Sequence, residues 1–175
     1  MESLGSLINA IADSRDGVLL QKMLRGVYDR MSSQIFNSAG LAQAGTSTKM
    51  KTANIIHGVA GGIPVTKAIT DNFWDPLAGF VVNIGKTNVL CLYMDAAGAA
   101  SSAFGVESTT GTAGQLVAGV KFPPIPEKKI LVGFVILSGG VTAWTAGTST
   151  FTTSTTDYYC TIVNTVGMFD PTATI

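Results

Sequence analysis

The chain has 175 residues, a formal net charge of zero and only 13% charged residues, about half the usual share in a soluble domain. This length allows one domain of ordinary size with an appendage, but hardly two full domains. Because binding nucleic acid needs a basic face, and the sequence has no Lys/Arg cluster beyond Lys128–Lys129, we expect no nucleic-acid partner. Few charges of balanced sign favour association, so we expect a homo-oligomer or a member of an assembly.

Residues 1–36 are predicted to form an N-terminal helical arm. They hold eight of the 22 charged residues and show the only sustained helical periodicity. A first apolar stripe contains Leu4, Ile8 and Ile11. A second stripe repeats at spacings of four, three and four, the pattern of a heptad seam. The residues of this heptad seam are Leu20, Leu24, Val27 and Met31.

The heptad seam has two interpretations. It covers under two heptads, fewer than the roughly three or four that identify a coiled coil. Either the helix packs on its own β domain, or it associates with another copy or docks on a partner.

Residues 37–50 are predicted to be a linker, because they are small and polar and include Gly40 and Gly45. Such a linker would let the arm reach a neighbouring molecule. Met1-Glu2-Ser3 lacks the positive region of a signal peptide. No apolar run approaches the roughly 20 residues of a membrane-spanning helix, so we expect cytoplasmic synthesis and no membrane partner.

Residues 51–175 are predicted to form a β domain, because short apolar or alternating runs follow one another between turn signals. The expected strands include Lys51–Ile56, Val65–Ile69, Phe80–Ile84, Val89–Met94, Phe104–Glu107, Gln115–Phe122 and Ile130–Leu137. The best predicted hairpin joins Phe80–Ile84 to Val89–Met94. Nine threonines between Val141 and Thr161 suit strands with one polar face. We expect a mainly β fold, an antiparallel β-sandwich or jelly roll with an N-terminal helical arm.

The most apolar run, Ile130–Leu137, is the element around which the domain is expected to form. Pro123, Pro124 and Pro126 keep the chain extended before it. Eight residues without a polar side chain predict a strand that is apolar on both faces. The run is too short to span a bilayer. It therefore needs protein cover on both faces, from a second sheet or from another subunit.

The sequence contains no catalytic constellation, and we expect neither enzymatic activity nor a metal or other cofactor. The segment from Gly79 to Thr87 ends like a phosphate-binding loop, but five residues separate its glycines instead of four and strand-like residues follow. His57, the only histidine, has no accompanying motif. Cys91 and Cys160 lie in apolar runs and are expected to be buried thiols, although their spacing leaves a disulfide open.

Three stretches follow one another in a family-like order. A proline-rich turn leads into a Gly-centred apolar strand over Val120–Leu137, a Thr/Gly loop follows at Thr145–Phe151, and a last strand begins at Tyr158-Tyr159. From about Phe104 onward, the chain resembles the β domains of small virion proteins of tailed bacteriophages, of the head decoration (cement) and head-fibre type.

The resemblance implies a non-enzymatic structural protein of the virion. Such proteins commonly form trimers and bind the outside of a capsid, so it implies the major capsid protein or another virion protein as a partner. It also implies attachment through an N-terminal arm or one rim. The chain lacks the repetitive shaft of a long fibre, which favours a compact decoration or cement role. The resemblance transfers no functional residues, because the family has no catalytic site.

Two functions are therefore considered. The first is a capsid decoration or cement protein that assembles or docks through the heptad seam. The second is a carbohydrate-binding or adhesin-like module with glycan contacts at Phe73, Trp74, Trp144 and the Tyr158-Tyr159 pair. Lectins share the jelly-roll architecture, so the fold alone does not separate the two.

Overall fold

The computed structural model describes residues 15–74, 79–108, 120–152 and 158–167. These residues contain one α-helix and eleven β-strands. The elements are α2 (Arg15–Met31), β1 (Gln34–Ile35), β2 (Leu41–Gln43), β3 (Met50–Thr52), β4 (Ile56–Ala60), β5 (Ile63–Lys67), β6 (Val81–Val82), β7 (Thr87–Asp95), β8 (Ala100–Phe104), β9 (Lys129–Gly139), β10 (Trp144–Thr145) and β11 (Tyr158–Asn164). The first predicted stripe, at Leu4, Ile8 and Ile11, lies outside the described residues.

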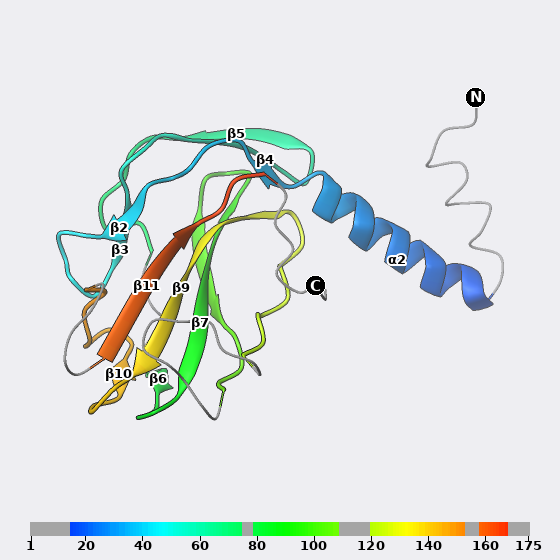
Figure 1. The fold of residues 1–175 in the computed structure, drawn as a ribbon. Coiled ribbons are helices and arrows are strands. Elements are labelled where there is room, and N and C mark those ends of the chain that lie inside the picture. The colour runs from blue at the N-terminus through cyan, green and yellow to red at the C-terminus, as the bar shows by residue number, and fades with distance from the viewer. Residues whose placement is uncertain (1–14, 75–78, 109–119, 153–157, 168–175) are drawn as a thin grey trace.

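The protein is mainly β, and its named strands pair antiparallel, as predicted. The largest sheet has four strands in the order β11-β9-β7-β8. Three smaller sheets have the orders β1-β4-β5, β2-β3 and β10-β6. In Figure 1 the smaller sheets surround the long strands β7, β9 and β11, while α2 extends away from them.

The central strand of the largest sheet is β9. It pairs with β11 along one edge and with β7 along the other, and each of its residues from Ile130 to Gly139 is buried. Leu92 of β7 pairs with Gly133, whereas Tyr93 pairs with Leu131, so one extra β9 residue forms a β-bulge there. The prediction of a strand buried on both faces is confirmed.

Each face of β9 is covered by a different part of the chain. Ile130, Val132, Val135 and Leu137 face a core completed by side chains of the smaller sheets and the loops beside them. These covering side chains include Ile35, Leu41, Met50, Ile56, Trp74, Val82, Trp144 and Phe151. On the other face, Phe134 packs among residues that include Phe122 and Ile125 from the proline-rich segment. The rings of Phe122 and Phe134 pack edge to face, with their centroids 5.1 Å apart. This cover comes from the chain itself.

The predicted boundaries of the arm and the linker are wrong. Residues 37–50 were expected to be a linker, yet Ala39, Leu41 and Met50 are buried in the core. A Cβ atom on Gly133 would collide with Leu41 Cδ1, which shows how closely this segment packs on β9. Strand β1 also belongs to the β domain, although it falls within the arm predicted at 1–36. The apolar residues that lie among the small polar ones anchor this segment to the sheet.

The predicted hairpin between Phe80–Ile84 and Val89–Met94 is also wrong. Strand β6 pairs with β10, and β7 pairs with β8 and β9. A strand that is apolar on both faces belongs in the interior of a sheet, and there both of its edges are already paired. The chain therefore leaves β6 in a different sheet from β7 despite the short polar connection between them.

We predict that Ile130→Ala destabilises the protein by about 2 to 5 kcal/mol, because it removes buried methyl groups from the core beside β9 and leaves a cavity. The matched control is Ile84→Ala, since Ile84 is 61% exposed and should change stability by less than about 0.5 kcal/mol. Urea unfolding followed by circular dichroism measures both. Equal effects of the two variants would contradict the described core.

Candidate interaction surface

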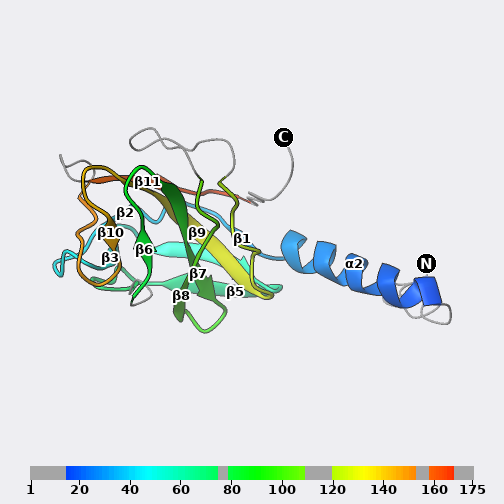
Figure 2. The same ribbon diagram turned by 90° about the horizontal axis from the view of Figure 1, so that it is seen from below.

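The helix α2 carries exposed apolar side chains along the heptad seam. Leu20 is 40% exposed, Val27 54% and Met31 63%, while Leu24 is half-buried. Because the helix stands clear of the sheets in two perpendicular views (Figures 1 and 2), the seam is not covered by the β domain. Of the two interpretations of the seam, packing on its own β domain therefore does not match the structure.

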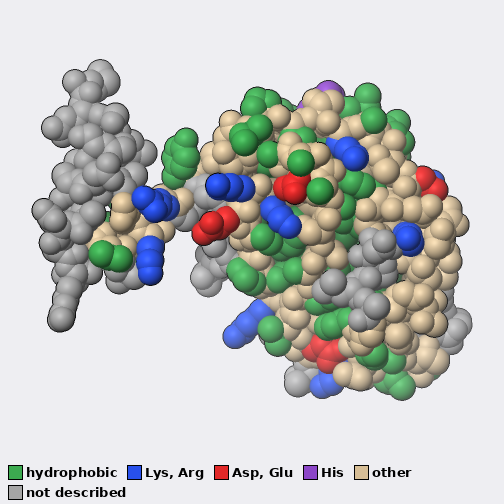
Figure 3. Space-filling view, turned by 180° about the vertical axis from the view of Figure 1, so that it is seen from behind, with side chains coloured by type: hydrophobic (Ala, Val, Ile, Leu, Met, Phe, Trp, Pro, Cys, Tyr) green, Lys and Arg blue, Asp and Glu red, His purple; other side chains and the backbone are tan. Residues whose placement is uncertain are grey.

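Two further apolar residues of α2 are exposed beside the seam, and the sequence analysis did not single them out. They are Met23 and Tyr28, whereas the exposed Val18 lies one turn before Lys22, on the opposite face of the helix. Met23 precedes the seam residue Leu24, and Tyr28 follows the seam residue Val27, so they widen the apolar surface on either side of it. Figure 3 shows hydrophobic and basic side chains on the helix where it projects from the domain. The periodicity alone could have indicated Met23 and Tyr28 as flanking positions.

The C-terminal end of α2 is held against the β4–β5 turn. The Gly62 amide donates to the Ser32 carbonyl at 3.0 Å, and the Gly61 amide donates to Ser33 Oγ at 2.9 Å. Both glycines have positive φ angles of 56° and 82°, which suit glycine in a tight turn. These two hydrogen bonds fix the root of the arm at one end of the β domain.

The tryptophans proposed as glycan contacts lie in the core. Trp74 and Trp144 are buried, and their indole N–H groups donate to the carbonyls of Tyr93 and Thr150 at 3.0 and 3.2 Å. Phe73 packs edge to face on Trp74, with ring centroids 4.3 Å apart. A sugar ring stacks on an exposed aromatic face, so the prediction of a sugar platform at Trp74 and Trp144 is wrong.

The Tyr158-Tyr159 pair does not form an exposed aromatic surface for stacking a sugar ring either. The Tyr158 hydroxyl accepts a hydrogen bond from the Thr150 amide at 3.0 Å and lies 2.8 Å from Thr150 Oγ1. These contacts tie β11 to the loop that contains Thr150. Tyr158 thus serves the packing of this loop, and both tyrosines are only partly exposed.

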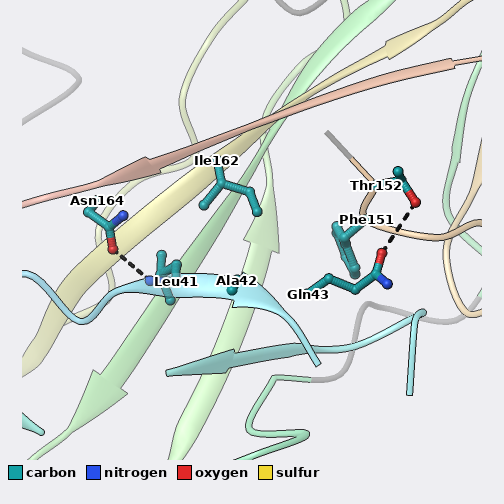
Figure 4. Close-up of a pocket in the computed structure, with 7 residues that line it drawn as sticks. All are labelled: Leu41, Ala42, Gln43, Phe151, Thr152, Ile162 and Asn164. Atoms are coloured by element: carbon teal, nitrogen blue, oxygen red, sulfur yellow. Dashed lines mark hydrogen bonds between the residues drawn. The ribbon is translucent and has the colours of Figure 1, made fainter. Parts of the chain in front are cut away.

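A shallow groove lies where β2 meets β11 (Figure 4). Its lining consists of Leu41, Ala42, Gln43, Phe151, Thr152, Ile162 and Asn164. The Leu41 amide donates to Asn164 Oδ1 at 2.8 Å, and Thr152 Oγ1 donates to Gln43 Oε1 at 3.4 Å. The lining has no charged or nucleophilic group beyond the Thr152 hydroxyl, so the groove presents no catalytic arrangement.

The remaining residues considered for chemistry do not come together. The exposed His57 lies on β4, with Nδ1 3.3 Å from Thr66 Oγ1. Lys86 precedes strand β7 instead of a helix. The segment from Gly79 to Thr87, which resembles a phosphate-binding loop in sequence, therefore does not have the geometry of a phosphate site. In the described ranges, no group of three or more His, Cys, Asp or Glu side chains could hold a metal ion.

The two cysteines are buried free thiols, as expected. Cys91 belongs to the cluster that contains Phe134, and Cys160 belongs to the core on the opposite face of the sheet. A disulfide between them would have to cross the sheet. Burial raises the pKa of Cys91 to about 12 and the pKa of Cys160 to about 12.

Comparisons with known proteins add no relative. No family model, curated protein or solved structure matches the chain. Among the described residues, no helix has the length and apolar character needed to cross a membrane. The candidate surface therefore rests on the geometry of α2 and its root.

The buried thiols predict low reactivity. At pH 8 we expect neither Cys91 nor Cys160 to react with a chromogenic disulfide reagent in the folded protein, and both to react after unfolding in guanidinium. Since folding raises both pKa values, the folded state holds these protons more tightly. Stability should therefore fall as the pH rises from about 9 towards about 12. A thiol that reacts rapidly in the folded protein would contradict its burial.

Proposed function

We propose that this chain is a non-enzymatic structural protein that assembles into a homo-oligomer through the heptad seam of α2. The observation that carries the proposal is the exposure of Leu20, Val27 and Met31 on a helix that stands clear of its own β domain. Such a surface gains free energy when another protein surface covers it. The low charge content of the chain supports the same conclusion.

In its most specific form, the proposal is a decoration or cement protein on the capsid of a tailed bacteriophage. The resemblance of the Val120–Leu137 and Thr145–Phe151 stretches supports this assignment. The chain would then act as a trimer in the virion, with the major capsid protein as its second partner, and would stabilise the head. Finding the chain in purified particles by mass spectrometry tests this part separately from self-association.

The proposed architecture of the β domain is an antiparallel β-sandwich or jelly roll. The four-stranded sheet would form one layer, and the smaller sheets on its larger core would form the other. The support is the shared core, in which β9 residues such as Val135 pack with Ile56 and Trp144 from the smaller sheets. A β domain with such a well-packed core suits a structural role in an assembly.

Replacing Leu24 tests the seam. We predict that Leu24→Asp lowers the native mass from that of an oligomer to that of a monomer, because it puts a charge into a buried apolar contact between copies. Sedimentation equilibrium measures the mass, and circular dichroism checks that the β domain stays folded. An oligomer that survives the substitution with unchanged affinity contradicts the role of the seam.

Lys22→Asp is the matched control. Lys22 is exposed on the face of α2 opposite the seam, and the control introduces the same residue two positions away. It should leave the native mass unchanged. If it dissociated the oligomer as strongly as Leu24→Asp does, loss of helix structure would explain the result instead of loss of the seam.

A further inference from the structure

The sheet formed by β1, β4 and β5 packs on the core with one face only. Ile35, Ile56 and Val65 belong to the core, and a Cβ atom on Gly58 would lie 2.9 Å from Ile130 Cδ1 of β9. Side chains alternate between the two faces of a strand, so the residues between these point away from the core. This second face is named here the outer face, and its residues are Gln34, Phe36, His57, Val59, Pro64 and Thr66.

The outer face is an exposed surface without charged side chains. Phe36 is 56% exposed, its amide donates to the His57 carbonyl at 2.8 Å, and His57 pairs with Thr66. These three residues therefore form a row across the sheet. Lys67, the only Asp, Glu, Lys or Arg residue of the three strands, pairs with Ile56 and so belongs to the other face. Such a surface suits an apolar partner.

The outer face matches the heptad seam in size. From Leu20 to Met31 the seam extends about 16 Å along the helix axis. The five residues of β4 extend about 16 Å as well. Three neighbouring strands are about 10 Å across, close to the diameter of a helix. One helix can therefore cover the outer face, and burying an apolar stripe on a sheet is a common way for a helix to pack.

A contact between seams alone would be small. The seam covers under two heptads, fewer than the roughly three or four of a recognisable coiled coil. All of α2 has 17 residues, whereas a stable interface takes roughly 20 to 30 residues from each side. If each copy contributes both its seam and its outer face, it takes part in two contacts, and the interface approaches that size.

The arm does not cover its own outer face. In Figures 1 and 2, α2 points away from the β domain. Only Ser32 and Ser33 separate α2 from β1, and both accept hydrogen bonds from the turn at Gly61 and Gly62. The helix would have to reverse its direction within these two residues. Another copy is therefore the occupant that leaves this connection as it stands.

We propose that the heptad seam of one copy packs on the outer face of another copy. This inference rests on the proposed self-association and adds the surface that receives the helix. Because each copy offers one helix and one receiving face, the contact joins unlike surfaces, and the assembly closes as a ring in which every helix and every face is occupied.

Replacing Phe36 tests the outer face. We expect Phe36→Asp to raise the dissociation constant of the oligomer about tenfold or more, because a carboxylate would be buried against the seam. Sedimentation equilibrium on the full chain measures the constant, and circular dichroism checks the fold. The matched control is Ile63→Asp, which should leave the constant unchanged. Ile63 is also 56% exposed, but it pairs with Ala60 on the other face of the same sheet. Equal constants for Phe36→Asp and the unmodified chain overturn the proposal.

Mixing two variants distinguishes the outer face from a contact between seams. The Leu24→Asp chain keeps its outer face, and the Phe36→Asp chain keeps its seam. At a concentration where each variant alone is monomeric, we expect the mixture to form a complex, since one intact contact between seam and outer face remains. If seams bound each other, the Leu24→Asp chain would find no partner. A mixture without the mixed complex overturns the proposal.

A photo-cross-linker at position 36 identifies the occupant directly. Benzoylphenylalanine replaces Phe36, and isotope-labelled and unlabelled chains are mixed so that mass spectrometry separates links between copies from links within one copy. We expect links to peptides from Arg15–Met31 of another copy. An oligomer whose links to α2 stay within one copy, or that forms none, overturns the receiving face and leaves self-association intact. A monomeric native mass of the unmodified chain overturns the proposed function itself.

Discussion

The structure depends on the burial of β9 on both faces. Residues Ile130–Leu137 of β9 have no polar side chain, so the chain must cover both faces of the sheet at this strand. One cover combines the smaller sheets, through residues such as Ile56 and Trp144. The other comes from the proline-rich segment through Phe122 and Ile125. Much of the described β domain is therefore engaged in covering this strand, and both tryptophans are used for packing.

The helix α2 shows the opposite situation. Most of its described apolar side chains are exposed, whereas the chain covers β9 on both faces. Hydrogen bonds from Gly61 and Gly62 hold the residues that follow the helix against the β4–β5 turn. A fixed, exposed apolar helix beside a well-packed domain favours assembly as the role of the arm.

Some of the fold could be predicted from the sequence. Ile130–Leu137 was identifiable because eight apolar residues in a row leave few alternatives, and the helix was identifiable because its apolar residues repeat at helical spacing. Which strands pair with one another was harder to predict from the sequence, because the partners lie far apart along the chain. The short connection between Val82 and Thr87 suggested a hairpin. However, β7 pairs with β8 and β9 on its two edges, so β6 pairs with β10 instead. The prediction of a linker at 37–50 failed because apolar residues among the small polar ones, such as Leu41 and Met50, are buried in the core, with Leu41 packed against Gly133.

The candidate surface was predictable in part. The seam residues followed from periodicity, while their exposure required the three-dimensional arrangement. The central claim is that the arm joins copies of this chain. Light scattering on a sizing column, applied to the full chain and to a chain beginning at Ser32, tests it most directly. The account predicts an oligomer for the full chain and a monomer for the shortened one. Monomers in both cases, or an oligomer that persists without the arm, would contradict it.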